Sequence, residues 1–394
     1  MAMPCVAVAG GSLGGLTAAL VLRDAGCQVE VYERSHAPLS GYGAGIVVQP
    51  ELSRYFLERT DLTLERISVP SDSIKYYDAA RGTLIGKVDA AWRYTSYNAL
   101  YRGLLRAYGR ERYHLGETLS AIEQDEKEVR LRFASGREAR CGLAVCADGS
   151  FSTARQLLLD VDPRYAGYVT WRGLAPQGTL SPDAWRFFDG HFTYGLLPDS
   201  HLIAYPIPTV TDEVHVDGRS INFQWYWNVA EGAPLDALMT DRHGARRPVS
   251  VHADDVQSPW LEELRRRARE RIALEPFVEL IERAPQPFVT IIADTDVPRM
   301  AIGRACLIGD AAVTGRPHAA AGAAKAAANG WALAEALVAA NGDVADALRR
   351  WEPQQLRQGR AMLAKVRRMG ELLQSGGPFA PGDPANRFGL PPAD

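Results

Sequence analysis

The chain has 394 residues, 46% of them hydrophobic and 23% charged, which suits about two or three domains and excludes a miniprotein, a fibre or a disordered chain. The 44 lysines and arginines nearly balance the 47 aspartates and glutamates, so the net charge of -3 argues against nucleic acid and membrane surfaces as partners. Without a run of about 18 apolar residues or a basic leader, we expect a cytoplasmic protein. The five cysteines are odd in number and lack CxxC spacing, so we expect reduced thiols and no metal site.

The first forty residues predict one strand–helix–strand unit. Residues 6–8 form a short apolar run, the glycine-rich turn GGSLGG follows at 10–15, and apolar residues then recur at helical spacing over 13–20. A second apolar strand follows at 29–31. This order is typical of the βαβ unit that opens a dinucleotide-binding domain.

The glycine-rich turn departs from the G-x-G-x-x-G pattern, because Ser12 takes the place of the second glycine. A serine there still leaves the N-terminus of the helix able to bind a phosphate. Glu33 ends the second strand, where a carboxylate can accept both hydroxyls of an adenosine ribose and disfavours a 2′-phosphate, although the neighbouring Arg34 weakens that distinction. The pattern predicts a dinucleotide site at Gly10, Gly15 and Glu33, and it does not separate FAD from NAD.

The sequence pattern changes in the middle of the chain. Residues 96–106 have a helical pattern, whereas from about residue 165 short aromatic-rich strands alternate with turns of Pro, Gly and Asp. This predicts an antiparallel sheet inserted into an α/β domain. In one of its strands His201 and Tyr205 lie four residues apart and therefore share a face. In another, residues 221–228 alternate strictly between an apolar and a polar face.

The last third returns to the α/β pattern. It predicts a charged helix over 260–283, a buried strand over 305–308, an alanine-rich helix near 319–340 and a final helix over roughly 344–374. The remaining tail is too rich in proline and glycine for regular structure.

Two further motifs follow buried strands. Each places a glycine beside an aspartate at a strand end, and the second is followed by a proline and a glycine at the start of the alanine-rich helix. These residues are Asp148 with Gly149, then Gly309 with Asp310, Pro317 and Gly322.

Together with the first turn, these motifs resemble the single-component FAD monooxygenases that hydroxylate aromatic rings, the family that includes para-hydroxybenzoate hydroxylase. The resemblance covers nearly the whole chain and includes LYRGLL at 100–105. It implies a Rossmann-like FAD-binding domain with an inserted antiparallel-sheet substrate domain and a C-terminal helix. The implied ranges are 1–69, 96–164 and 288–345 for FAD, 70–95 and 165–287 for substrate, and 346–394 for the last helix and the irregular tail.

Family roles carry over by position. Gly10, Ser12 and Gly15 would line the pyrophosphate, and Glu33 beside Arg34 would hold the ribose. Asp148 and Gly149 would serve the FAD and the approach of the nicotinamide. Gly309 and Asp310 would bind the ribityl chain, and the loop from Pro317 to Gly322 would lie against the flavin ring. The chain departs from the family at Tyr97, where an Arg or Gln is common, and at Asn329, where an acidic residue is usual. A helix N-terminus after Pro317 also suits the pyrimidine side of an anionic reduced flavin.

The implied activity is hydroxylation of an electron-rich aromatic ring ortho to a hydroxyl, with NADH or NADPH and O₂, through a flavin C4a-hydroperoxide. The first candidate substrate is 2,6-dihydroxypyridine, and a homodimer is a family expectation. The alternatives are the same chemistry on another phenol or azaarene, or a non-catalytic flavin-binding regulator. Polar candidates for a catalytic pocket argue against the regulator.

Those pocket candidates are His201, Tyr205 and His318. An imidazole on the sheet face can remove a proton from a ring hydroxyl and so push electrons into the ring. His318 follows Pro317 in a loop, where a functional position is more common than in a core. Ordinary sheet packing for His201 and Tyr205, and a polar helix start for His318, are the structural alternatives. Which of the three is the base stays open.

Overall fold

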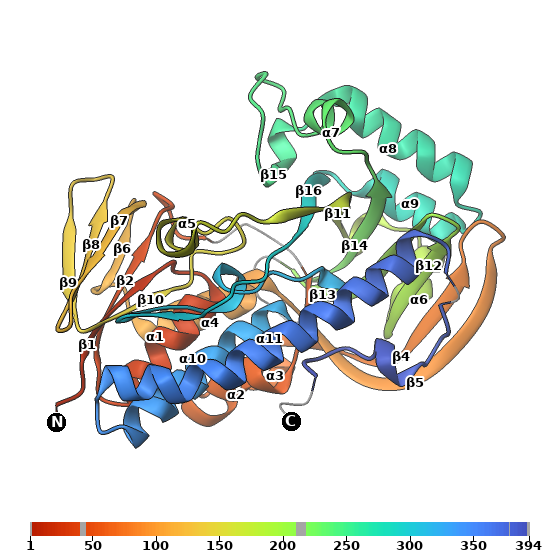
Figure 1. Cartoon of the computed structure of the whole chain (residues 1–394). Helices are drawn as coiled ribbons and strands as arrows, with labels where there is room; N and C mark the ends of the chain where they lie inside the picture. Colours follow the sequence, from red (N-terminus) through yellow and green to blue (C-terminus); the bar gives the residue numbers. More distant parts are fainter. Residues whose placement is uncertain (1, 40–44, 210–217, 378, 392–394) are drawn as a thin grey trace.

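The computed structural model describes residues 2–39, 45–209, 218–377 and 379–391 and contains two large sheets (Figure 1). The first sheet has six strands in the order β17-β18-β10-β1-β2-β6. Its strands are parallel except for β17 at the edge, which pairs antiparallel with β18. The bounds are β1 Cys5–Ala9, β2 Gln28–Glu33, β6 Tyr113–Leu115, β10 Leu143–Cys146, β17 Ala301–Ile302 and β18 Ala305–Leu307.

Helices pack around the parallel sheet. The helix of the predicted first unit, α1 Leu13–Asp24, contacts both α10 Gly322–Ala339 and α4 Tyr97–Tyr108. The helix α2 Pro50–Arg59 packs on α10 as well. Figure 1 shows α11 Val344–Gln374 running from the parallel sheet to the second sheet, and its bounds are those that the sequence predicts.

The second sheet has nine strands in the order β15-β16-β11-β14-β13-β12-β4-β5-β3. All neighbours are antiparallel except β12 and β4. The bounds are β3 Gly45–Val47, β4 Ser68–Asp78, β5 Thr83–Ser96, β11 Arg164–Pro176, β12 His191–Leu197, β13 Ser200–Pro208, β14 Arg219–Asn228, β15 Ser250–Val251 and β16 Phe288–Asp294.

The two faces of the nine-stranded sheet differ, as the alternation over 221–228 predicts. Ile221, Phe223, Trp225 and Trp227 belong to one hydrophobic cluster with residues of the helices that cover that face. Those helices are α6 Pro182–Phe188, α7 Ala233–Leu238, α8 Ser258–Arg271 and α9 Glu275–Arg283. The opposite, polar face lines a cavity.

The helix expected over 260–283 is two helices. The break falls after Arg271, and α9 begins at Glu275 with Pro276 in its first turn. A proline lacks the backbone N–H and clashes with the preceding turn, so it starts a helix more readily than it continues one.

Sheet membership also differs from the predicted division of the chain. The strands β3 and β16 come from ranges assigned to the FAD-binding domain, 1–69 and 288–345, yet both lie in the nine-stranded sheet. The reason is backbone pairing, since β16 pairs with β11 and β3 pairs with β5. Order along the chain did not reveal these pairings.

The remaining elements are small. A three-stranded sheet is formed by β7 Leu119–Gln124, β8 Val129–Phe133 and β9 Glu138–Cys141, and two short helices are α3 Leu64–Ile67 and α5 Thr153–Leu159.

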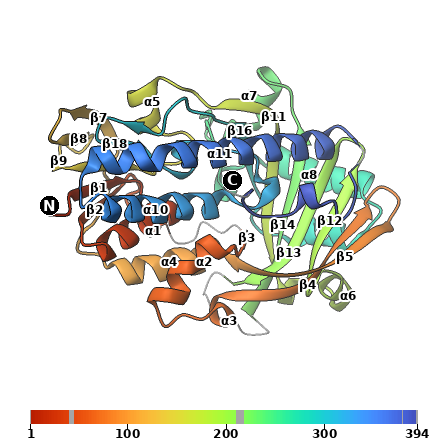
Figure 2. The same ribbon diagram turned by 60° about the horizontal axis from the view of Figure 1, so that its bottom comes forward.

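No helix among the described residues is both long and apolar enough to cross a membrane. All five cysteines are free thiols, and Cys5 alone among them is exposed. Figure 2 shows α11 and α10 side by side above α4.

Candidate active site

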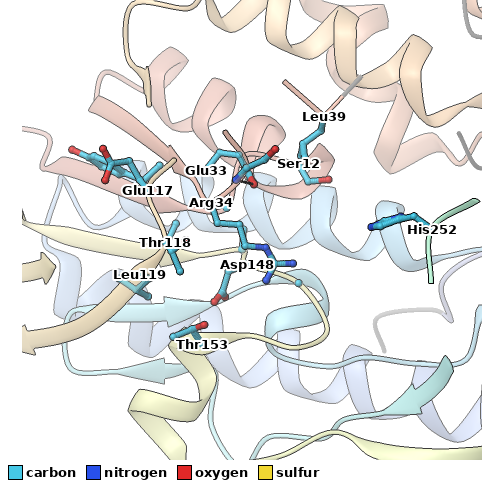
Figure 3. Close-up of a pocket in the computed structure, with 16 residues that line it drawn as sticks. Ser12, Glu33, Arg34, Leu39, Glu117, Thr118, Leu119, Asp148, Thr153 and His252 are labelled. Carbon is cyan, nitrogen blue, oxygen red and sulfur yellow. Dashed lines mark hydrogen bonds between the residues drawn. The ribbon is translucent and has the colours of Figure 1, made fainter. Parts of the chain in front are cut away.

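A first cavity of about 430 Å³ opens beside the carboxyl ends of β1, β2 and β10. In doubly wound α/β folds ligands bind at this edge of a parallel sheet. Figure 3 shows how side chains from separate segments point into this space. Among the predicted cofactor residues, those that line the first cavity are Gly10, Ser12, Glu33, Arg34, Asp148 and Gly149.

The glycine-rich turn is too tight for side chains at two positions. Gly10 has φ +102°, and a Cβ on Gly15 would lie 1.8 Å from the carbonyl oxygen of Gly10. The backbone N–H of Gly11 donates to Glu33 Oε2 (2.8 Å), and that of Ser35 donates to Oε1 (2.9 Å). These bonds fix the Glu33 carboxylate at the cavity wall while each oxygen keeps a further lone pair.

Two unusual residues near the turn contact each other: Ser12, which replaces the second glycine of the G-x-G-x-x-G pattern, and Tyr97, which replaces the Arg or Gln common in the family. The hydroxyl of Tyr97, at the start of α4, lies 2.8 Å from Ser12 Oγ. Burial raises the pKa of Tyr97, so the phenol stays neutral and can donate or accept. A serine in place of the second glycine thus gains a partner where the family commonly has an Arg or Gln.

Asp148 holds the loop between β10 and α5. Its carboxylate accepts hydrogen bonds from Ser152 Oγ (2.5 Å) and from the backbone N–H of Ala154 (3.0 Å). The buried Arg155 then ties this loop to the Gly-Asp motif by donating to the carbonyl oxygens of Ser150 (2.7 Å) and Ala311 (3.1 Å). The second and third motifs are therefore joined by one side chain.

The Gly-Asp motif forms the short helix η4 Gly309–Ala311. Lys325, buried in α10, donates to Asp310 Oδ1 at 3.0 Å, and 41% of the Asp310 side chain stays exposed. The amide oxygen of Asn329 accepts from the backbone N–H of Gly309 at 2.9 Å. Asn329 therefore supports the turn itself. Neither Gly309 nor Asp310 lines the first cavity, and neither does Gly15.

A second cavity of about 130 Å³ lies on the polar face of the nine-stranded sheet and includes all three predicted catalytic residues. His201 and Tyr205 come from β13, while His318 and Pro317 come from η5 Pro317–Ala319, just before Gly322. Aromatic rings form much of the remaining wall. They belong to Phe192, Tyr194, Tyr226 and Phe388.

Both cavity histidines are buried and held by defined partners. His201 Nδ1 lies 2.9 Å from Gln374 Oε1, and its ring stacks on Tyr226 at 4.2 Å. Burial lowers the pKa of His201 to about 3, because a charged imidazole loses its hydration. His318 Nε2 lies 2.7 Å from the hydroxyl of Tyr168, and burial lowers its pKa well below the usual value. Both imidazoles are neutral at neutral pH.

Curated relatives and solved structures match nearly the whole chain, and a family model matches its middle part. A family described as FAD binding domain-like matches residues 165–294. A 2,6-dihydroxypyridine 3-monooxygenase of Paenarthrobacter nicotinovorans is 51% identical over 389 residues, which are 99% of this chain and 96% of that protein. The chain belongs to the FAD-dependent aromatic-ring monooxygenases. It is an enzyme, which removes the alternative of a non-catalytic regulator.

Other relatives of this monooxygenase place it in the same fold. The structure of 2,6-dihydroxypyridine-3-hydroxylase from Arthrobacter nicotinovorans has a TM-score of 0.95 at 50% identity and covers 100% of this chain and 98% of that one. A 3-amino-4-hydroxybenzoate 2-monooxygenase of Streptomyces cremeus is 28% identical, with 93% of this chain and 86% of that protein covered. The Rossmann-like fold with an inserted sheet is thus confirmed.

The first cavity fits the FAD of this monooxygenase. The turn around Gly10 and Gly15 leaves no room for a Cβ, which lets a pyrophosphate approach the backbone. The N-termini of α1 and α10 have no side-chain cap and no acidic residue in their first turns, so their N–H groups can bind anions. The Glu33 carboxylate lies at the wall of this cavity, and Asp310, in η4, keeps one carboxylate oxygen without a lysine partner.

Sequence reasoning missed several residues in and around the second cavity, among them Arg172, Gln374 and Phe388. Arg172 of β11 is the single charged residue among the described residues that line it, and its Nη2 donates to Gln224 Oε1 at 3.2 Å. The alternation of β11 could have placed Arg172 on the polar face. Gln374, which holds His201, and Phe388, which closes one wall, come from the C-terminal part and have no signal in the sequence.

Proposed function

We propose that this monooxygenase hydroxylates 2,6-dihydroxypyridine at C3 to 2,3,6-trihydroxypyridine, with NADH or NADPH and O₂ as co-substrates. The observation that carries the proposal is the second cavity, whose volume of about 130 Å³ is close to the roughly 150 Å³ of an engineered cavity that binds benzene. Its aromatic walls and a few polar groups suit one small hydroxylated ring. The relative with 51% identity is named for this substrate.

Bound FAD supplies the oxidising chemistry, taking a hydride from the nicotinamide and activating O₂ so that one oxygen atom enters the ring and the other leaves as water. The protein must make the ring electron-rich, since a pyridine ring is electron-poor unless its hydroxyls are ionised. A neutral His201 accepts a proton from the ring hydroxyl next to the carbon that is attacked. The anionic ring then raises the pKa of His201, because opposite charges favour the protonated imidazole.

The other polar groups of the second cavity orient the substrate and balance its charge. Tyr205 and His318 line the cavity from different elements, β13 and η5. Burial raises the pKa of Tyr205, which keeps this phenol a neutral hydrogen-bond donor. Arg172 supplies a positive charge beside an ionised ring oxygen.

The substrate assignment is tested by turnover under labelled oxygen. Purified enzyme is supplied with NADH or NADPH and ¹⁸O₂ and screened against hydroxypyridines and phenols. We expect 2,6-dihydroxypyridine to stimulate NADH or NADPH consumption most and the trihydroxypyridine to carry one ¹⁸O atom. Unlabelled product, or a stronger response to another phenol or azaarene, would replace this substrate with the alternative of the same chemistry on a different ring.

The role of His201 is tested by substitution. We expect His201→Ala to lower hydroxylation by about 10²–10⁴-fold, the usual contribution of a general base, and hydrogen peroxide to replace the hydroxylated product. Product and peroxide are measured in the same reaction against consumed NADH. Full coupling in this variant would transfer the base role to Tyr205 or His318, whose variants Tyr205→Phe and His318→Ala are assayed alongside.

Cytoplasmic location and a homodimer complete the proposal. The free thiols, four of them buried, suit a reducing compartment. Sedimentation of the FAD-loaded protein at several concentrations should give twice the chain mass of 43.1 kDa. A monomer at all concentrations would remove the homodimer from the proposal and leave the chemistry unaffected.

A further inference from the structure

The orientation of His201 is set by the end of the C-terminal helix. Gln374, the last residue of α11, is buried, and its Oε1 lies 2.9 Å from His201 Nδ1. These two residues are 173 positions apart in the chain. Gln374 therefore brings a segment outside the nine-stranded sheet to the proposed base.

The amide group of Gln374 is itself oriented by Asn228 at the end of β14. Asn228 Nδ2 donates to the carbonyl oxygens of Gln374 and Asp199, both at 2.9 Å. Its Oδ1 consequently faces Gln374 and accepts from Gln374 Nε2 at 3.1 Å. With Nε2 committed to Asn228, the oxygen of the Gln374 amide is the atom that faces His201. An amide oxygen only accepts, so His201 Nδ1 must carry the hydrogen.

We propose that Gln374 is a positioning residue that fixes His201 as the Nδ1–H tautomer, which leaves Nε2 as the proton acceptor for the substrate. This inference rests on the base role proposed for His201. The lone pair of a neutral imidazole resides on the nitrogen without hydrogen, so the tautomer decides which nitrogen can take a proton. A His201 ring with hydrogen on Nε2 would offer the substrate a donor in place of an acceptor.

The surroundings of His201 contain no competing carboxylate among the described residues. The titratable side chains that face it are Tyr226 of β14, Tyr194 of β12 and His318 of η5, with ring centroids at 4.2, 6.4 and 5.2 Å. Arg172 of β11 lines the same cavity. Stacking on Tyr226 restricts rotation of the imidazole. The amide of Gln374 is thus the group that selects the tautomer.

The tautomer is measured directly by long-range ¹⁵N–¹H NMR of the FAD-bound enzyme with labelled histidine, with the His201 signals assigned by their loss in His201→Asn. We expect the Nδ1–H pattern in the wild-type protein and its loss or mixing in Gln374→Leu. A wild-type His201 with hydrogen on Nε2 would overturn the inference, whatever the activity. The control is Gln355→Leu, which removes another buried glutamine of α11, bonded to Asn329, and should leave the His201 signals unchanged.

Measurements of kcat, KM and their pH dependence test what the Nδ1–H tautomer of His201 contributes to hydroxylation. We expect Gln374→Leu to lower the kcat of hydroxylation by about 10–100-fold with little change in the substrate KM, because Gln374 acts through His201. Gln374→Glu should restore most of kcat at high pH, since a carboxylate also accepts from Nδ1–H. It should also move the acidic limb of the profile upward by about 1–3 pH units, because the new charge stabilises the imidazolium.

The outcomes separate the two proposals. Equal losses in Gln374→Leu and Gln374→Glu with an unmoved acidic limb would indicate a merely structural role for Gln374 and overturn the inference. If the Nδ1–H pattern is present and Gln374→Leu removes it without loss of hydroxylation, the tautomer assignment is supported and the base role of His201 falls.

Discussion

Ala320 has a left-handed backbone conformation, with φ 51°, between η5 and α10. This conformation costs an alanine about 1–2 kcal/mol, whereas a glycine adopts it freely. The residue lines the second cavity, and its carbonyl oxygen accepts from Gln49 Nε2 at 3.4 Å. The strain is therefore located where the loop must follow a fixed path along the second cavity.

We expect Ala320→Gly to raise the free energy of unfolding by roughly 0.5–1 kcal/mol, since relief of strain exceeds the added entropy of the unfolded chain. Chemical denaturation of the FAD-loaded enzyme measures the change. The control is Asn341→Gly, at another position of positive φ (51°), where asparagine already tolerates the conformation and the gain should be smaller. A destabilised Ala320→Gly would mean that the methyl group contributes more by packing than it costs in strain.

Because His201 and His318 are buried as neutral imidazoles, we expect acid to destabilise the folded state. Their folded pKa values lie below the unfolded value of about 6.5, so the unfolded chain binds protons that the folded protein excludes. The stability is fully present above about pH 6.5 and is lost as the pH falls toward 3. At pH 5 each histidine should cost about 2 kcal/mol. Urea unfolding at pH 7 and pH 5 measures the difference.

Substitution separates this effect from general acid unfolding. In His201→Gln the loss of stability between pH 7 and pH 5 should shrink by about 2 kcal/mol, because one of the two excluded protons is gone. The exposed His243 supplies the control, and His243→Gln should keep the full loss. An unchanged difference in His201→Gln would contradict the neutral state of the buried imidazole.

At the scale of elements, the contact between η4 and α10 holds the Asp310 carboxylate in place. Asp310 lies in η4 and is paired with Lys325 in the first turn of α10. We expect Asp310→Ala to weaken FAD binding by about 10–100-fold, because a ribityl hydroxyl loses a charged acceptor. Equilibrium dialysis of the apoprotein with FAD gives the Kd. Glu335→Gln, on the exposed side of α10, should bind FAD like the wild type. Equal affinities in both variants would remove the ribityl role from Asp310.

Elements with strong local signals were predictable, and pairings between distant segments were not. The bounds of α11 and the two faces of β14 follow from periodicity alone, which is a local property. His201, Tyr205 and His318 meet as expected, since two share a strand face and the third follows a recognisable motif. The partners of β16 and the contact of Gln374 with His201 depend on the tertiary path of the chain. No local pattern encodes them.

At the scale of the whole molecule, the second cavity is built by both halves of the fold. His201 and Tyr205 come from the nine-stranded sheet, while Pro317 and His318 precede α10, which packs on the helices of the parallel sheet. A ring bound there contacts both parts and can therefore shift the balance between their arrangements. We therefore expect occupation of the second cavity to affect the FAD site.

We expect substrate to accelerate reduction of bound FAD by NADH or NADPH and the reaction to be slow without it. The sequence has one dinucleotide fingerprint, so the nicotinamide must approach transiently, and coupling reduction to substrate avoids wasteful oxidation. Anaerobic stopped-flow spectroscopy at the flavin absorption measures the rate with and without 2,6-dihydroxypyridine. Equal rates under both conditions would count against coupling between the two cavities.

One wall of the second cavity comes from outside both sheets. Phe388 lies in the irregular segment after α11 and packs on Phe192 and Trp92, with ring centroids at 4.9 and 5.6 Å. A substitution of Phe388 alters this wall of the cavity without changing a backbone pairing of either sheet. Natural selection, or a laboratory library restricted to this segment, can thus vary the ring substitution patterns that the cavity accepts while the strands of both sheets keep their pairings.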